Sequence, residues 1–290
     1  MRLTLKGQER RESLFKGVFF LSALLSVLAI VVISIFIFGN ALPFLLKQGL
    51  GDFLFGTDWS PSNLPPTYGI LPMIVGSLLV TAGAIVLGVP VGVLTAVFMV
   101  YFCPKALYSL LKPSVNVMAG IPSIVYGFFG LQFIVPWIRS YGGTGLSVLS
   151  AVILLGIMIL PTIISLSETA LRAISKDDYA ASLALGASHE RTVFKVMLPA
   201  ARSGIFSAVI LGVGRAIGET MAVILVAGNQ PVMPSGLLRG VRTMTTNIVL
   251  EMAYASGEHR EALITTAAVL FLFILLINAV FVWVKRRSER

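Results

Sequence analysis

Long apolar runs are the feature that most constrains what this chain can fold into. Each run exceeds the roughly 20 residues that an α-helix needs to cross the hydrocarbon core of a bilayer. Only 12% of the 290 residues are charged, whereas soluble domains carry about 25%. The sequence therefore predicts an all-α, polytopic membrane protein with six transmembrane helices, over the runs Gly17–Phe38, Ile70–Phe102, Ser114–Trp137, Ser147–Leu171, Ser203–Gly228 and Ala262–Val284.

The first two runs need separate comment. No small-residue cleavage site follows the first run, so we expect a retained span rather than a cleaved signal. The second is long enough for one kinked helix or for two spans; Pro72 suits the first turn of a helix and Pro90 would kink it midway. Gly88 and Gly92 form a G-x-x-x-G pattern that allows a neighbouring helix to pack closely.

The distribution of positive charge predicts the orientation in the membrane. Lys and Arg collect in alternate loops, and the positive-inside rule then places both termini in the cytoplasm, which requires an even number of spans. The net charge of +9 is explained by this topology and not by a nucleic-acid partner. The predicted cytoplasmic cations are Arg2, Lys6, Arg10, Arg11, Lys16, Lys105, Lys112, Arg172, Lys176, Arg191, Lys195, Arg202, Lys285, Arg286, Arg287 and Arg290, against Lys47, Arg139, Arg239, Arg242 and Arg260 outside.

This topology divides the chain into three parts. Residues 1–69 hold a cytoplasmic tail, the first span and an external loop. Residues 70–284 form a five-helix core with a long cytoplasmic loop at 172–202, and residues 285–290 form a second cytoplasmic tail. One cysteine and two distant histidines argue against a metal centre, and without a phosphate-binding G-x-x-x-x-G-K-[ST] loop we expect no ATP hydrolysis and no enzyme activity in this chain.

The cytoplasmic loop has a helical pattern with a glycine in a defined place. Ser175 or Asp177 can cap its first helix, and Gly186 can end that helix in a left-handed conformation. A second helical segment, Ser188–Leu198, then leads to Pro199. The simplest alternative is an ordinary amphipathic loop helix.

The spacing in this loop resembles the E-A-A-x3-G-x9-I-x-L-P motif of the ABC-importer permeases. Two positions depart from it: Ala180 stands in place of the glutamate and Ser182 in place of the second alanine. The resemblance implies the type I ABC importer permease fold, and a coupling helix that docks on an ATP-binding subunit. The residues that it assigns to ATPase coupling are Ala181, Ser182, Gly186, Ala187, Leu198 and Pro199.

A charged pair interrupts the fifth run. Arg215 lies near its middle, where a charge costs roughly 2.5–3.5 kcal/mol on insertion scales. If the helix continues, Glu219 projects from the same face four residues later, and Gly214 and Gly218 allow a neighbouring helix to pack against it. The pair is either an internal salt bridge that holds helices together, or a site where the guanidinium binds a passing oxyanion through paired N–H donors.

The surrounding sequence, G-R-A-I-G-E-T-M-A-V, is similar to the signature of the phosphate-transporter permeases. That resemblance assigns Arg215, Glu219 and Thr220 to the substrate path. The downstream segments Arg242–Thr245, Asn247, Leu250–Met252 and Gly257–His259 look like the PstC branch rather than the PstA branch. Thr243, Thr245 and Thr246 could donate hydroxyls to an anion at an external vestibule, or be helix-capping or solvated, and the second alternative is favoured. Glu168 is expected to be interfacial rather than pore-lining.

The resemblance implies a permease subunit of an ATP-driven phosphate importer in a bacterial or archaeal plasma membrane. The implied partners are a PstA-like second permease, two ATP-binding subunits that hold ATP and Mg, an external phosphate-binding protein, and membrane lipid. An importer of another oxyanion, such as sulfate or molybdate, is the main alternative. A membrane-embedded enzyme with an Arg–Glu active site and a passive channel or anchor are the others.

Overall fold

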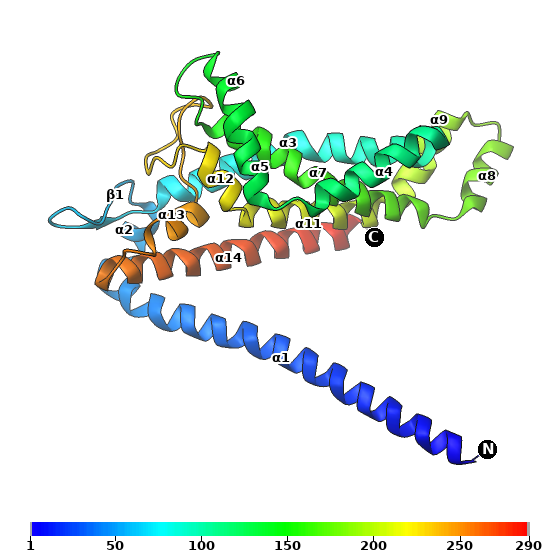
Figure 1. The fold of residues 1–290 in the computed structure, drawn as a ribbon, viewed down its shortest axis with the longest axis horizontal. Helices are drawn as coiled ribbons and strands as arrows, with labels where there is room; N and C mark the ends of the chain where they lie inside the picture. Colours follow the sequence, from blue (N-terminus) through cyan, green and yellow to red (C-terminus); the bar gives the residue numbers. More distant parts are fainter. Residues whose placement is uncertain (1, 289–290) are drawn as a thin grey trace.

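The structure is a computed structural model that describes residues 2–288 and is mostly helical (Figure 1). The α-helices are α1 (Arg2–Gln48), α2 (Leu50–Phe55), α3 (Leu71–Val97), α4 (Lys105–Gly120), α5 (Ser123–Phe129), α6 (Val135–Arg139), α7 (Val148–Arg172), α8 (Lys176–Ala184), α9 (His189–Thr192), α10 (Leu198–Ala200), α11 (Arg202–Gly218), α12 (Met221–Val226), α13 (Met244–Glu251) and α14 (Gly257–Ser288). Three π-helical segments, η1 (Phe98–Phe102), η2 (Gly130–Ile134) and η3 (Val193–Met197), continue α-helices. A hairpin of β1 (Trp59–Ser60) and β2 (Thr67–Tyr68) departs from a purely helical chain.

The long apolar helices account for the predicted spans. Four are long and apolar enough to cross a membrane by themselves: Leu14–Gln48, Leu71–Phe102, Val148–Arg172 and Gly257–Lys285. Two bent pairs raise the number to as many as six if each pair is one span, namely Lys105–Gly120 with Ser123–Arg139 and His189–Ala200 with Arg202–Gly218. The long second run is one helix, because α3 passes Pro90 and continues into η1.

Two of the predicted spans are interrupted. The third run bends by 102° between α4 and α5, where Ile121 is extended ahead of Pro122, since a residue before proline disfavours the helical conformation. The fifth run breaks after Gly218, because Glu219 is extended (φ −69°, ψ 129°) and α12 begins only at Met221. Both breaks lie inside apolar sequence, so hydropathy alone does not reveal them.

The chain ends also differ from the predicted division. Helix α1 continues past Pro43 to Gln48, so the first part of the predicted external loop is helical. Helix α14 extends to Ser288, so residues 285–288 continue the last helix rather than forming a separate tail. Met1, Glu289 and Arg290 lie outside the described residues.

Helix α7 is the centre of the packed core, with α3 and α11 against it. Helix α3 packs closely against α7 because a small residue or valine recurs at every fourth position along the buried face of α3. A Cβ on Gly88 would lie 2.6 Å from Cδ1 of Ile159, and one on Gly92 would lie 2.8 Å from Cγ2 of Ile163. The buried residues on this face are Gly76, Val80, Ala84, Gly88, Gly92 and Ala96.

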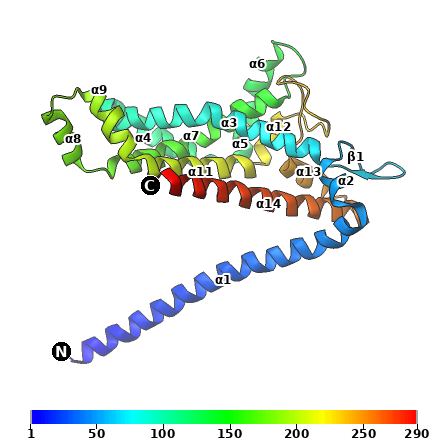
Figure 2. The same cartoon turned by 180° about the vertical axis from the view of Figure 1, so that it is seen from behind.

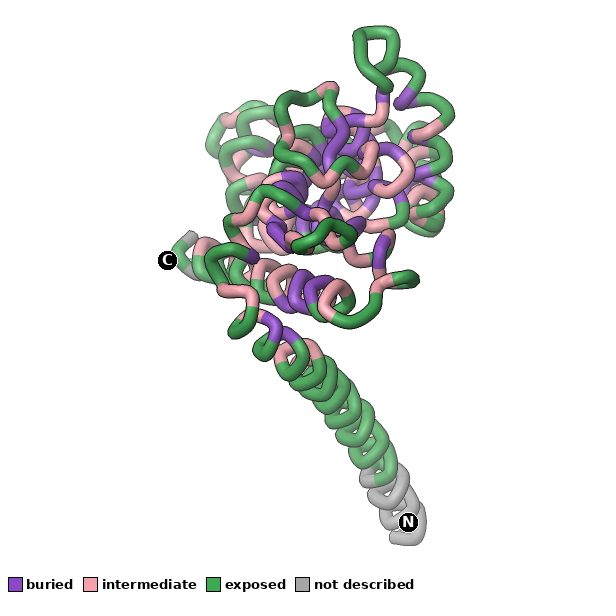
Figure 3. Tube along the Cα trace, turned by 90° about the vertical axis from the view of Figure 1, so that its left-hand side faces the viewer, coloured by how far each residue is buried: buried purple, intermediate pink, exposed green. Residues whose placement is uncertain are grey.

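Helix α1 stands apart from the core. It meets α14 near the Phe38 and Phe271 rings, whose centroids are 6.0 Å apart, and diverges from the other helices towards its start (Figures 1 and 2). Its apolar side chains are exposed along most of its length (Figure 3). In a bilayer, lipid or another subunit must cover this surface.

Candidate translocation and coupling sites

Arg215 lies in the last turn of α11 and has no carboxylate partner among the described residues. The one hydrogen bond of its guanidinium runs from Nη1 to Oγ1 of Thr162, over a long 3.5 Å. The helical pairing predicted with Glu219 is wrong, because the helix ends one residue before the glutamate. The guanidinium is therefore held weakly and most of its donors remain free.

Glu219 and Thr220 stabilise the helix break itself. Oε1 of Glu219 accepts hydrogen bonds from the backbone N–H groups of Thr220 and Ala222, each 3.1 Å long. The hydroxyl of Thr220 donates to the carbonyl of Gly218, and that of Thr245 donates to the carbonyl of Glu219. A broken helix exposes such groups without intrahelical partners, and these side chains satisfy several of them.

A small polar cavity lies beside the break. It has a volume of about 10 Å³, which suits about one water molecule. Thr243 and Thr246 form a reciprocal capping box at the start of α13, which agrees with the predicted capping role for these two threonines, whereas none of the three threonines is solvated. The polar residues that line the cavity are Ser77, Thr81, Glu219, Thr243 and Thr245.

The glycines that flank Arg215 do not pack against a helix of this chain. At Gly214 and Gly218, apart from the adjacent residues and the backbone of the same turn of helix, no described atom lies within 4 Å of the position that a Cβ would take. The expected packing role is therefore not met within the chain. Together with Leu211, which is 57% exposed, they form an open face of α11 next to Arg215 that a second subunit could cover.

The predicted coupling segment forms a separate projection. Helix α8 begins after Ser175, whose hydroxyl accepts a hydrogen bond from the N–H of Asp177, and no residue of α8 is buried. Gly186 follows at φ +83°, a conformation that favours glycine. Of the assigned coupling residues, Ala181, Gly186 and Pro199 are exposed, and Ser182, Ala187 and Leu198 are half-buried.

Aromatic residues attach this projection to the core. The hydroxyl of Tyr179 lies 2.7 Å from Nδ1 of His189, and the His189 ring packs edge-on against Phe102 at 4.7 Å. The Tyr101 ring stacks on Tyr179 with centroids 6.4 Å apart. A movement of α8 would therefore be transmitted to the end of α3. The sequence singled out neither tyrosine, because the contacts join segments far apart in the chain.

Glu168 is buried in an ion-pair cluster near the end of α7. It is 3% exposed and accepts hydrogen bonds from Tyr108 at 2.7 Å, Lys112 at 2.8 Å and Arg172 at 2.9 Å. The cluster joins α4 to α7. Three donors satisfy this buried carboxylate, which fits a structural role better than a pore-lining one.

A second polar cluster closes the opposite end of the molecule. Glu251 is 7% exposed and accepts hydrogen bonds from Arg242 Nη1 at 2.5 Å and Trp59 Nε1 at 2.9 Å. Nε2 of His259 lies 2.8 Å from the same carboxylate, and Arg242 also donates to Asn247 Oδ1. One carboxylate thus connects β1, α13, α14 and the segment before α13. No local sequence signal joins these residues.

Replacing Glu251 with leucine should destabilise the protein by about 3–5 kcal/mol, because it leaves the Arg242 guanidinium buried without its counter-ion. The measurement is the unfolding midpoint of the purified protein in detergent. The matched control is Glu261→Leu on the exposed surface of α14, which should change it little. Equal effects of the two substitutions would contradict a stabilising role for this cluster.

Comparisons with known proteins agree with this architecture. Residues 88–290 match the family described as "Binding-protein-dependent transport system inner membrane component". The chain is 40% identical to the probable ABC transporter permease protein YqgH of Bacillus subtilis, over 88% of this chain and 86% of that protein. It is 31% identical to the phosphate transport system permease protein PstC 1 of Mycobacterium tuberculosis, over 82% of each chain.

Solved structures show the same fold. A bacterial alginate ABC transporter chain aligns with a TM-score of 0.63 at 15% identity, covering 91% of this chain and 94% of that chain. A chain of the inward-facing MetNI methionine ABC transporter aligns with a TM-score of 0.57 at 23% identity, covering 77% and 95%. The family's members are multi-pass permease subunits that work with ATPase and substrate-binding partners, and they are not themselves enzymes. This chain belongs to the binding-protein-dependent transport system inner membrane component family, the permease subunits of ABC importers.

Proposed function

We propose that this chain is the PstC-type permease subunit of an ATP-driven phosphate importer. The observation that carries the proposal is Arg215, a guanidinium in a membrane-spanning helix with one long hydrogen bond and no carboxylate partner among the described residues. Such a residue costs free energy unless it faces a cavity, a partner or a substrate. A guanidinium matches the geometry of phosphate through paired donors.

The surroundings of Arg215 support a path shared with a second subunit. Leu211, Gly214 and Gly218 leave one face of α11 open. A PstA-like permease would cover this face, and the path would run between the two subunits past Arg215. Glu219 and Thr220 contribute by holding the helix break that ends α11 next to the arginine.

The other proposed partners would bind at the two ends of the molecule. Two ATP-binding subunits, which hold ATP and Mg, would receive α8 and Gly186 of this chain and the equivalent loop of the second permease. The first turns of α1 lie at the same end of the long axis as α8, and α14 runs towards that end (Figure 1), in agreement with termini on the cytoplasmic side. An external phosphate-binding protein would deliver the anion at the opposite end.

The relatives support phosphate as the substrate. Besides the mycobacterial protein, the phosphate transport system permease protein PstC of Mesorhizobium japonicum is 30% identical over 79% of this chain. Sulfate and molybdate are the competing substrates, because a guanidinium binds any tetrahedral oxyanion. Discrimination against sulfate and molybdate would depend on the translocation path formed by both permease subunits together.

Uptake by the reconstituted complex tests the proposal. Proteoliposomes that hold the chain with its partner subunits and binding protein should accumulate radiolabelled phosphate when ATP is supplied. Unlabelled phosphate should compete, and a hundredfold excess of sulfate or molybdate should not. ATP-driven uptake of sulfate or molybdate in place of phosphate would contradict the phosphate assignment and leave the importer assignment standing.

A further inference from the structure

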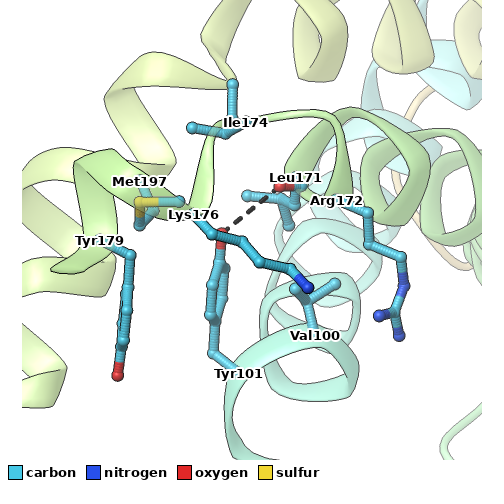
Figure 4. A pocket seen from close by; sticks show the side chains of 8 residues that line it. All are labelled: Val100, Tyr101, Leu171, Arg172, Ile174, Lys176, Tyr179 and Met197. Atoms are coloured by element: carbon cyan, nitrogen blue, oxygen red, sulfur yellow. Dashed lines mark hydrogen bonds between the residues drawn. The ribbon is translucent and has the colours of Figure 1, made fainter.

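A pocket of about 470 Å³ lies where the coupling segment joins the core. It is formed by η1, which continues α3, by the end of α7, by the turn before α8 and α8 itself, and by η3 (Figure 4). The pocket does not include Arg215, Glu219 or Thr220, and the two tyrosines that attach α8 form part of its wall. Its lining residues are Val100, Tyr101, Leu171, Arg172, Ile174, Lys176, Tyr179 and Met197.

Two cations border the pocket, and one of them is held in place. Nε of Arg172 donates to the buried Glu168 at 2.9 Å, and its guanidinium carbon lies 5.0 Å from the centre of the Tyr108 ring. Its Nη groups make no hydrogen bond to the described residues, and the Arg172 side chain is 48% exposed. The guanidinium is therefore pre-oriented with its outer donors free.

Local charge favours an anion in this pocket. Glu168 is shared between Arg172 and Lys112, so one carboxylate faces two cations. Lys176 adds a third positive charge; it is exposed and forms no ion pair with a described residue. Its side chain extends over Tyr101 towards Val100 (Figure 4). Asp177 and Asp178 are the nearest carboxylates along α8, and neither lines the pocket.

The remaining walls are apolar and aromatic. Val100, Leu171, Ile174 and Met197 supply aliphatic surface, and the Tyr101 and Tyr179 rings lie nearly parallel, at 13°. A free inorganic anion would leave this surface without a partner. A phosphate attached to a glycerol and an acyl chain would fill both the charged and the apolar parts.

The position of the pocket fits a lipid. It lies at the ends of two membrane-spanning helices, where tyrosine and basic side chains meet the headgroup region. Basic pockets between helices on the cytoplasmic side bind anionic headgroups. The cytoplasmic assignment rests on the topology proposed above.

We propose that this pocket binds the headgroup phosphate of an anionic phospholipid, with Arg172 and Lys176 as its ligands. The lipid contacts both the ends of the spans and the first turn of α8. It therefore stabilises the connection through which α8 acts on α3 and α7. The proposal does not depend on which substrate is imported.

Lipid retention by the purified complex, with all its partner subunits, tests the proposal. The delipidated complex in detergent is titrated with phosphatidylglycerol or phosphatidylcholine, and bound lipid is measured by native mass spectrometry alongside the unfolding midpoint. Phosphatidylglycerol should bind and raise the midpoint, and phosphatidylcholine should not. Lys176→Gln should weaken phosphatidylglycerol binding about fivefold, whereas Lys105→Gln, at an exposed cation outside the pocket, should match the native protein.

Two further measurements distinguish a bound phospholipid from a free anion. Ile174→Trp narrows the pocket without changing its charge, and should also weaken phosphatidylglycerol binding if the acyl or glycerol part enters. Inorganic phosphate tests the free anion: if it raises the midpoint of the native protein but not that of Lys176→Gln, or if Lys176→Gln retains the lipid like the native protein, the lipid site is refuted. Unequal effects of Lys176→Gln and Lys105→Gln support it, whatever the outcome of the uptake assay.

Discussion

Replacing Arg215 with glutamine should lower phosphate uptake by at least about a hundredfold while the complex still assembles. Glutamine keeps a hydrogen-bonding group but is two bonds shorter than arginine, and it removes the charge and the paired donors. Two charge-assisted hydrogen bonds to an anion contribute roughly 1.5–3 kcal/mol each, and their combined loss accounts for the expected effect. Uptake in proteoliposomes and the basal ATPase rate are measured on the same preparation.

The controls for this substitution separate charge from geometry. Arg215→Lys keeps the charge and loses the planar fork, so partial uptake is expected. Arg139→Gln removes an exposed arginine at the end of α6, away from α11, and should leave uptake intact. The side chain of Arg215 hydrogen-bonds one described side chain, that of Thr162. Arg215→Gln should therefore leave folding largely unchanged. Normal uptake by Arg215→Gln would overturn the anion-contact role.

Replacing Gly186 with valine should uncouple ATP hydrolysis from uptake. Gly186 has φ +83°, a left-handed conformation that costs an ordinary residue roughly 1–2 kcal/mol and is least accessible to β-branched residues. No described atom lies within 4 Å of a Cβ at this position, so backbone conformation rather than crowding decides the effect within this chain. The native loop conformation would be populated about 5- to 30-fold less.

The measurement is phosphate taken up per ATP hydrolysed by the reconstituted complex. Gly186→Asn is the matched control, because asparagine adopts the left-handed region readily, and it should retain most of the coupling. If the valine and asparagine variants both couple normally, the glycine conformation is unimportant for docking. If both lose coupling equally, an added side chain blocks a partner surface and the conformational explanation is wrong.

Four of the six predicted spans are single long apolar helices in the structure, and the bilayer is the reason. A membrane demands long apolar helices whose backbone groups are satisfied internally, so run length and composition indicate where such helices lie. Helix ends also followed local chemistry: Ser175 caps α8 and Gly186 adopts a positive φ after it. Such features depend on a few neighbouring residues.

The helix breaks and the polar clusters needed the tertiary structure. The pattern around Arg215 and Glu219 suggested one continuous helix, but the chain unwinds at Glu219, where its carboxylate and Thr245 satisfy the freed backbone groups. Glu251 gathers Arg242, Trp59 and His259 from distant segments. No periodicity predicts contacts of this kind.

The two glycine pairs show where sequence and structure divide. The same spacing occurs at Gly88 and Gly92 and at Gly214 and Gly218, and the sequence by itself determined that both helices are membrane-spanning and carry small residues on one face. Only the tertiary structure decided that the first pair lies against α7 and that the second faces away from the chain. The physical reason is that four-residue spacing defines a helical face, whereas the neighbour of that face depends on how all the helices pack together.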